Sequence, residues 1–165
     1  MAQKREVQQL IAIIDQAYDR RSWHGTNLRG SIRRTSLLQA AWRPDPARHN
    51  IWEIVVHAAY WKYVAWRRLT GSARGSFPLR GSNWFPRPHD ATDAEWRSDV
   101  AILDQMHRTL RAAVSSLSTR ELSQPSRGST DSNFVLLSGI AAHDLYHAGQ
   151  IQLLKTLLTT RLAVV

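Results

Sequence analysis

The apolar residues of this 165-residue chain recur at helical spacing through most of its length. In the first such segment Val7, Leu10, Ile11, Ile14 and Tyr18 follow one another at intervals of one, three or four residues. This spacing places the side chains on one face of a helix, whereas a half-buried strand would alternate at every second residue. No segment shows that alternation, so the sequence predicts an all-α protein.

Four helical regions are predicted from this periodicity and from capping residues. They cover about residues 6–18 with a continuation over 26–38, 50–69, 92–117 and 133–160. Two regions begin with the pattern of a capping box, Asn50 with Glu53 and Thr92 with Glu95. A chain of this length is expected to form one domain, residues 1–165, built as a four-helix bundle.

A long irregular segment, about residues 72–90, separates the second and third helical regions. Irregular segments of more than about 12–15 residues in compact domains are often functional. Arg80, Asn83 and Trp84 lie in this segment, and we take them as candidate pocket residues.

The positive charge of the chain is concentrated in one stretch. The whole chain has 22 Lys and Arg against 13 Asp and Glu, a net charge of +9, whereas residues 20–88 carry 13 basic and two acidic residues, or +11. The same stretch contains six of the seven Trp residues. Basic residues among aromatic ones suit either a nucleic-acid surface or a pocket for a small anion. Most of the Trp residues occur at helical spacings that would bury them in the bundle, so nucleic acid is the less favoured partner.

The chain has no Cys, so any metal site must be built from His and carboxylates. His143 and His147 are four residues apart in the last helical region and share one face with its apolar residues. His57 lies on the apolar face of the second region, beside Ile54 and Trp61. Three neutral imidazoles on facing helices could bind Zn²⁺, Ni²⁺ or Fe²⁺ and leave positions open for water or substrate.

Two segments resemble the DinB/YfiT-like superfamily: residues 143–151, HDLYHAGQI, and residues 50–57, NIWEIVVH. The resemblance implies an up-up-down-down four-helix bundle, often a homodimer, with one divalent metal ion per chain. Carried over residue by residue, its ligands are His57, His143 and His147. The family includes metal-dependent hydrolases and S-transferases that use low-molecular-weight thiols, and many members have no known activity.

Several polar residues near these histidines have two possible roles. Glu53 could cap its helix, or it could orient His57 or act as a general base. Gln150 and Asp144 could hydrogen-bond an imidazole or a bound ligand, and Asp144 could instead be exposed. Among the other histidines, His107 is expected in the core and His24 in a surface turn, although His24 could also approach the metal. His49 and His89 have the context of ordinary loop residues.

The leading hypothesis is therefore a metalloenzyme that activates a thiol or a water molecule and acts on a small anionic substrate. Two alternatives stay open: a basic nucleic-acid-binding protein, and a bundle that binds metal without turnover. The first ten residues, MAQKREVQQL, lack the apolar run of a signal peptide, and no stretch is long and apolar enough for a membrane span. We accordingly expect a cytoplasmic protein.

Overall fold

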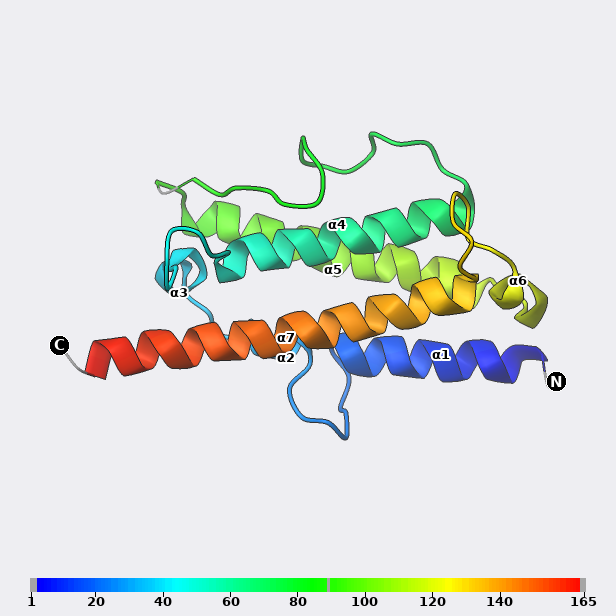
Figure 1. Ribbon diagram of the computed structural model, residues 1–165, viewed down its shortest axis with the longest axis horizontal. Coiled ribbons are helices and arrows are strands. Elements are labelled where there is room, and N and C mark those ends of the chain that lie inside the picture. The colour runs from blue at the N-terminus through cyan, green and yellow to red at the C-terminus, as the bar shows by residue number, and fades with distance from the viewer. Residues whose placement is uncertain (1–2, 89, 164–165) are drawn as a thin grey trace.

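Four long helices dominate the structure, a computed structural model that describes residues 3–88 and 90–163 (Figure 1). They are α1 (Gln3–Tyr18), α4 (Ile51–Thr70), α5 (Asp93–Ser115) and α7 (Asn133–Ala163). Three short helices lie in the connections: α2 (Leu28–Ser31), α3 (Leu37–Ala41) and α6 (Thr119–Ser123). All the secondary-structure elements in the described residues are helices, which confirms the predicted all-α fold.

The directions of the four long helices differ from those that the family resemblance implied. In Figure 1, α1 and α7 run from right to left, whereas α4 and α5 run from left to right, so the order along the chain is up-down-down-up. The predicted order, up-up-down-down, is wrong because α2 and α3 carry the chain along α7 to the far end before α4 begins. The hydrogen bond from Lys155 Nζ to the Ser31 carbonyl, 3.0 Å long, holds this connection against α7. A single long crossover, residues 71–92, then makes α4 and α5 parallel.

The predicted helix starts are confirmed where a capping side chain marks them. Asn50 accepts a hydrogen bond of 2.8 Å from the backbone N–H of Glu53 at the start of α4. Thr92 and Glu95 form a complete capping box at the start of α5. At its other end α4 stops at Gly71, whose φ of 72° is a left-handed conformation that favours glycine.

The predicted continuation of the first helix over residues 26–38 is wrong. The chain forms α2, leaves the helical conformation at Arg34, where φ is 58°, and starts again at α3. The new start is a capping box of Ser36 and Gln39, which satisfies the free N–H groups of a separate helix. The same signal, Ser118 with Glu121, begins α6 in a region that the sequence analysis treated as a turn.

The bundle interior is apolar at one end and includes aromatic and polar residues towards the other. Near the start of α1 and the end of α5, the core is formed by Leu10, Ile14, Leu110, Val114 and Leu137. Burying each such side chain contributes roughly 1.5–3 kcal/mol relative to leaving it exposed. These aliphatic contacts hold α1, α5 and α7 together at the end of the bundle where α1 and α7 begin.

His107 lies within the bundle, as predicted for a core residue. It is 4% exposed, and its ring stacks on Tyr18 with the ring centres 3.7 Å apart. Burial lowers the pKa of His107 to about 3, so its imidazole is neutral at pH 7. It therefore behaves as an aromatic side chain in the core.

A buried ion pair joins α4 to α7. Lys62 Nζ donates to a carboxylate oxygen of Asp144, and the two side chains are 0% and 1% exposed. Lys62 Nζ also lies 4.9 Å from the centre of the Tyr18 ring, close enough for a cation–π interaction. The alternative of an exposed Asp144 is thus wrong, because Lys62 on the facing helix neutralises the carboxylate inside the bundle.

This pair generates a stability prediction. Replacing Lys62 with Met, or Asp144 with Leu, leaves one charge buried without its partner and should lower the free energy of unfolding by about 3–5 kcal/mol. The double variant contains no unpaired charge, so its loss should be smaller than the sum of the two single losses. Urea denaturation of the four proteins measures this coupling. Strictly additive losses would show that the two groups do not stabilise one another.

Candidate metal centre

The three predicted histidines meet between α4 and α7. The Nε2 atom of His143 lies 3.1 Å from Nε2 of His57 and 3.0 Å from Nε2 of His147. One nitrogen from each ring can be chosen so that all three lie within 4.8 Å of one another. Histidine nitrogens bound to one ion at about 2.0–2.1 Å, with angles near 90–110°, would lie roughly 3.0–3.4 Å apart. The donor type and the two short distances therefore fit a single metal ion.

Helix geometry explains why these side chains converge. His143 and His147 are one turn apart on α7, and the antiparallel α4 presents His57 opposite them. His57 and His147 are buried, while His143 is half-buried. The Lys62–Asp144 pair lies within about one turn of the histidines on both helices and holds their alignment.

Hydrogen bonds to the outer nitrogens determine which nitrogen of two rings faces the centre. His57 Nδ1 donates to the backbone carbonyl of Asn83 at 2.8 Å, and His147 Nδ1 donates to Oε1 of Gln150 at 2.7 Å. A neutral imidazole whose Nδ1 carries the proton has an unshared electron pair on Nε2. The Nε2 atoms of His57 and His147 are thus acceptors that point towards His143.

The third ring cannot satisfy both of these acceptors. A proton on Nε2 of His143 can be shared with one of its two neighbours only, and the buried Nδ1 of His143 has no hydrogen-bond partner among the described residues. A metal cation at the centre would accept electron pairs from all three Nε2 atoms at once. One of the two Nε2 acceptors is therefore left without a hydrogen bond, and this favours a cation bound between the three rings.

All three imidazoles are in the neutral form that binds metals. Burial lowers the pKa of His143 to about 3 and that of His147 to about 4. Burial also lowers the pKa of His57, opposed by its hydrogen bond to Asn83. Because metals bind the deprotonated nitrogen, no proton has to be removed at neutral pH.

A stack of three rings covers one side of the centre. The Trp84 ring lies between His57 and His49, with centre distances of 3.8 and 3.5 Å and nearly parallel planes. His49 Nδ1 lies 3.0 Å from a carboxylate oxygen of Glu53, which anchors the outer ring of the stack. This role of His49 is not predicted from the sequence, where its one signal is the i, i+4 spacing to Glu53.

Glu53 supports the stack of rings through its contact with His49. Its carboxylate pairs with the guanidinium of Arg43, through a 2.8 Å bond from Nη1, and with His49. Burial favours a raised pKa, but the hydrogen bonds from Arg43 and His49 lower the pKa of Glu53 below its usual value. The carboxylate is therefore ionised and engaged with Arg43 and His49.

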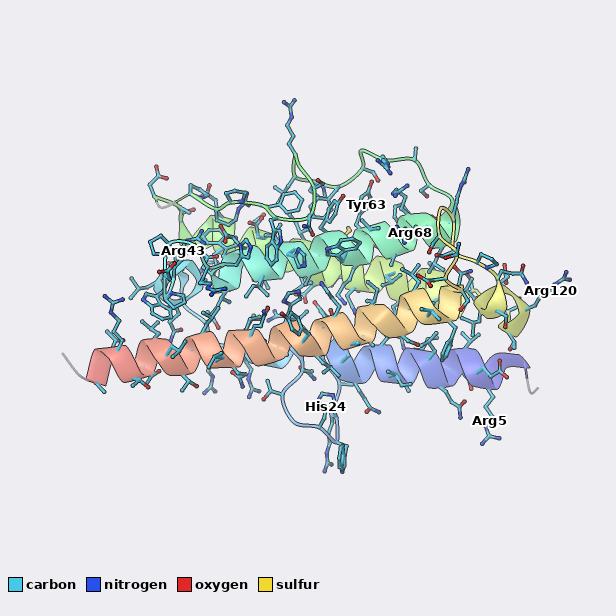
Figure 2. All side chains as sticks on the ribbon, viewed as in Figure 1. Arg5, His24, Arg43, Tyr63, Arg68 and Arg120 are labelled. Atoms are coloured by element: carbon cyan, nitrogen blue, oxygen red, sulfur yellow. The ribbon has the colours of Figure 1, made fainter. Side chains whose placement is uncertain are left out.

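The other candidate residues divide between the centre and its surroundings. Asn83, Trp84 and Gln150 contact the histidines, as described above, whereas Arg80 lines a separate pocket beside Tyr60. His24 lies in an exposed loop, away from the centre (Figure 2). His89 lies outside the described residues.

A cavity of about 540 Å³ opens beside His147. Its polar lining includes Gln150 and Tyr146, and its apolar lining includes Leu153 and Leu157 of α7. Of the three histidines His147 lines this cavity, so a small molecule of mixed polarity bound here would contact its ring.

Comparison with known families agrees with this geometry. Residues 19–151 match the DinB superfamily, and the chain belongs to it. No curated protein and no solved structure matches the chain significantly. Of the helices in the described part of the chain, none has the length and apolar character to cross a membrane.

The neutral histidines generate a pH prediction for the metal-free protein. Unfolded histidines take up protons near pH 6.5, whereas folded His143 and His147 do so only near pH 3 and 4. Since the unfolded state binds more protons between these values, the folded state should lose stability as the pH falls from 7.5 to 5.

The measurement is the urea midpoint in the presence of a chelator at several pH values. His143→Ala should reduce the pH dependence without abolishing it, because the pKa values of His57, His107 and His147 are also lowered by burial. His24→Ala in the exposed loop should leave the pH dependence unchanged. A midpoint that is constant from pH 7.5 to 5 would contradict the prediction.

Proposed function

We propose that this protein binds one divalent metal ion through the Nε2 atoms of His57, His143 and His147. The observation that carries the proposal is the meeting of three neutral imidazoles whose inward nitrogens cannot all be satisfied by hydrogen bonds. Three nitrogen donors suit Zn²⁺, Ni²⁺ or Fe²⁺ and leave other coordination positions open.

We further propose that the protein is a metal-dependent thiol S-transferase or, as the alternative, a hydrolase. A bound divalent ion would supply a nucleophile at neutral pH by lowering the pKa of a thiol or of a water molecule. The chain contributes the orientation of the imidazoles through Asn83 and Gln150, and a cavity beside His147 for the substrate. The substrate is proposed to be a small anion, in keeping with the positive charge of residues 20–88.

The distribution of carboxylates favours the thiol over water. A hydrolase commonly uses a carboxylate or histidine base to take the proton of the attacking water. Here the nearby carboxylates are engaged elsewhere, Glu53 with Arg43 and Asp144 with Lys62, and Nδ1 of the neighbouring His49 is engaged with Glu53. A thiol bound to such an ion would be deprotonated by it, so the chain would not have to supply a separate base.

Metal binding is tested by elemental analysis of the protein purified without an affinity tag. We expect about one equivalent of metal per chain, and His143→Ala should abolish it. Gln150→Ala should weaken metal affinity about 10- to 100-fold, because it removes the acceptor that orients His147. Gln152→Ala, on the same helix but bonded to Thr26, is the matched control and should bind metal normally. Unchanged stoichiometry in His143→Ala would overturn the site.

Activity is tested with the metal-loaded protein, a panel of low-molecular-weight thiols and an electrophile such as 1-chloro-2,4-dinitrobenzene. We expect protein-dependent consumption of thiol that is lost with chelator and in His143→Ala. Product formed equally well without any thiol would identify a hydrolase instead. Full metal occupancy with no turnover across the panel would favour a metal-binding bundle without activity.

A further inference from the structure

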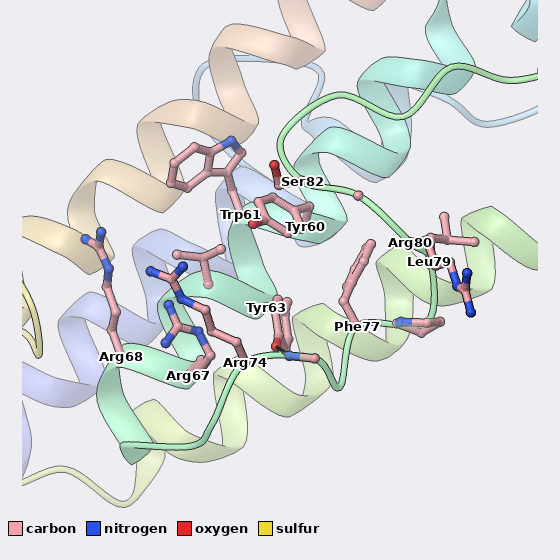
Figure 3. Close-up of a pocket in the computed structure, with 14 residues that line it drawn as sticks. Tyr60, Trp61, Tyr63, Arg67, Arg68, Arg74, Phe77, Leu79, Arg80 and Ser82 are labelled. Atoms are coloured by element: carbon pink, nitrogen blue, oxygen red, sulfur yellow. Dashed lines mark hydrogen bonds between the residues drawn. The ribbon is translucent and has the colours of Figure 1, made fainter.

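Four arginines gather at a second cavity, on the side of α4 that the 71–92 crossover covers (Figure 3). Arg67 and Arg68 come from the last turn of α4, and Arg74 and Arg80 come from the segment that follows. The cavity has a volume of about 600 Å³. Its lining contains no Asp or Glu, so nothing negative in the wall balances these side chains.

Several other arginines of the protein are paired with carboxylates. Arg29, Arg87 and Arg111 each lie within 3 Å of a carboxylate, from Asp104, Asp99 and Asp15 respectively. None of the four cavity arginines forms an ion pair with any residue that the structure describes. Exposed arginines elsewhere, such as Arg97 and Arg120, also form no ion pair with a described residue, but these four differ from them in lining one cavity together.

The C-terminus of α4 balances only part of the positive charge of these arginines. A helix C-terminus carries the equivalent of about half a negative charge, which favours nearby cations but balances less than one guanidinium. A fifth arginine adds to the surplus: Arg127 donates a 3.0 Å hydrogen bond to the carbonyl of Gly71 and lines an adjoining cavity with Arg67, Arg68 and Arg74. Cations gathered without counter-charges in this way favour the binding of an anion.

The cavity also has an aromatic wall. Phe77 lies 5.4 Å, between ring centres, from both Tyr60 and Tyr63. In Figure 3 these rings lie between Arg67, Arg68 and Arg74 on one side and Arg80 on the other. A ligand with an aromatic or other flat group next to its charge would thus contact both kinds of surface.

Trp61 connects this cavity to the three histidines. It lines the cavity, and its ring centre lies 6.3 Å from that of His57 and 6.4 Å from that of His143. Its indole N–H donates to the side-chain oxygen of Asn83 at 3.0 Å, which holds the ring in the shared wall. A molecule bound by the arginines is therefore separated from the metal centre by the Trp61 ring.

We infer that the cavity binds a small ligand that carries a doubly charged oxyanion of the phosphate class next to a flat group, across the Trp61 ring from the metal centre. Anion binding at this cavity does not require the metal, so the inference goes beyond the proposed function and does not depend on it. Paired N–H groups of guanidinium match the oxygens of phosphate and bind it in a bidentate manner. Arg67, Arg68 and Arg74 line both adjoining cavities, and Arg67 from α4 and Arg74 from the crossover are assigned as the principal contacts.

Isothermal titration at constant ionic strength tests the inference, with inorganic phosphate and phenyl phosphate as the two probes. We expect one saturable site per chain for each probe, with phenyl phosphate the tighter ligand because its ring reaches the aromatic wall. Arg67→Gln combined with Arg74→Gln should weaken both at least tenfold. Replacing Arg120 and Arg97, both exposed and outside the cavity, with Gln removes the same charge and should have no such effect. Equal affinity of the two probes would indicate a site for free phosphate, and would overturn the assignment of a ligand with a flat group.

The metal-free His143→Ala variant separates this site from the metal centre. Phosphate binding that persists there and still depends on Arg67 and Arg74 supports the cavity, even if metal binding or activity fails. Binding that disappears in His143→Ala but survives the arginine changes would place the anion on the metal and overturn the inference. A non-saturable response would overturn the inference. Duplex DNA that binds more tightly than phenyl phosphate, and whose binding is weakened equally by all the arginine substitutions, would identify a general nucleic-acid surface instead.

Discussion

The contact between α4 and α7 determines how the rest of this protein is arranged, because it buries polar groups that need partners from both helices. His57 faces His143 and His147, and Lys62, five residues further along α4, faces Asp144, the residue that follows His143. An unpaired polar group inside a bundle costs about 1–3 kcal/mol, and an unpaired charge costs more. Moving either helix by one residue would rotate its side chains by about 100° and separate these partners. The polar layer thus selects one alignment of two otherwise apolar helix faces.

The parallel arrangement of α4 and α5 has a direct consequence for the site. Two parallel helices require a connection that returns along their whole length, and here residues 71–92 do so across α4. This crossover passes over His57 and brings the Asn83 carbonyl to its Nδ1 and the Trp84 ring against its face. Asn83 has a φ of 62°, a left-handed conformation that Asn adopts more readily than most residues. The topology of the bundle therefore supplies the groups that orient the first histidine.

The sequence predicts those parts of the structure that depend on spacing along one helix. The i, i+4 pair His143 and His147, the apolar faces and the caps at Asn50 and Thr92 are properties of single helices, and the structure places them as expected. Features that depend on which helix lies opposite were not predictable in this way. The burial of Asp144 requires Lys62 on α4, and only the folded crossover brings Trp84 between His49 and His57.

Local signals can also compete with one another, as the chain between α1 and α4 shows. Its apolar residues have helical spacing over 26–38, but the capping box at Ser36 starts a new helix within that range. A capping side chain satisfies N–H groups that a continuous helix would have bonded internally, so a strong cap inside a periodic stretch favours two short helices. The break allows α2 and α3 to turn along α7, and this gives α4 its direction opposite to α1.

The excess positive charge of residues 20–88 has two structural origins. Some of its arginines pair with carboxylates and so add little free charge. Arg29 pairs with Asp104, Arg43 with Glu53, and Arg87 with Asp99. Others, such as Arg67 and Arg74, line the cavities at the end of α4 without a carboxylate. Because like charges held together raise the free energy of the folded state, such a group is more easily explained by an anion that binds there than by stability. The same charge that made a small anion the favoured partner from sequence is therefore concentrated beside the wall that Trp61 shares with the three histidines.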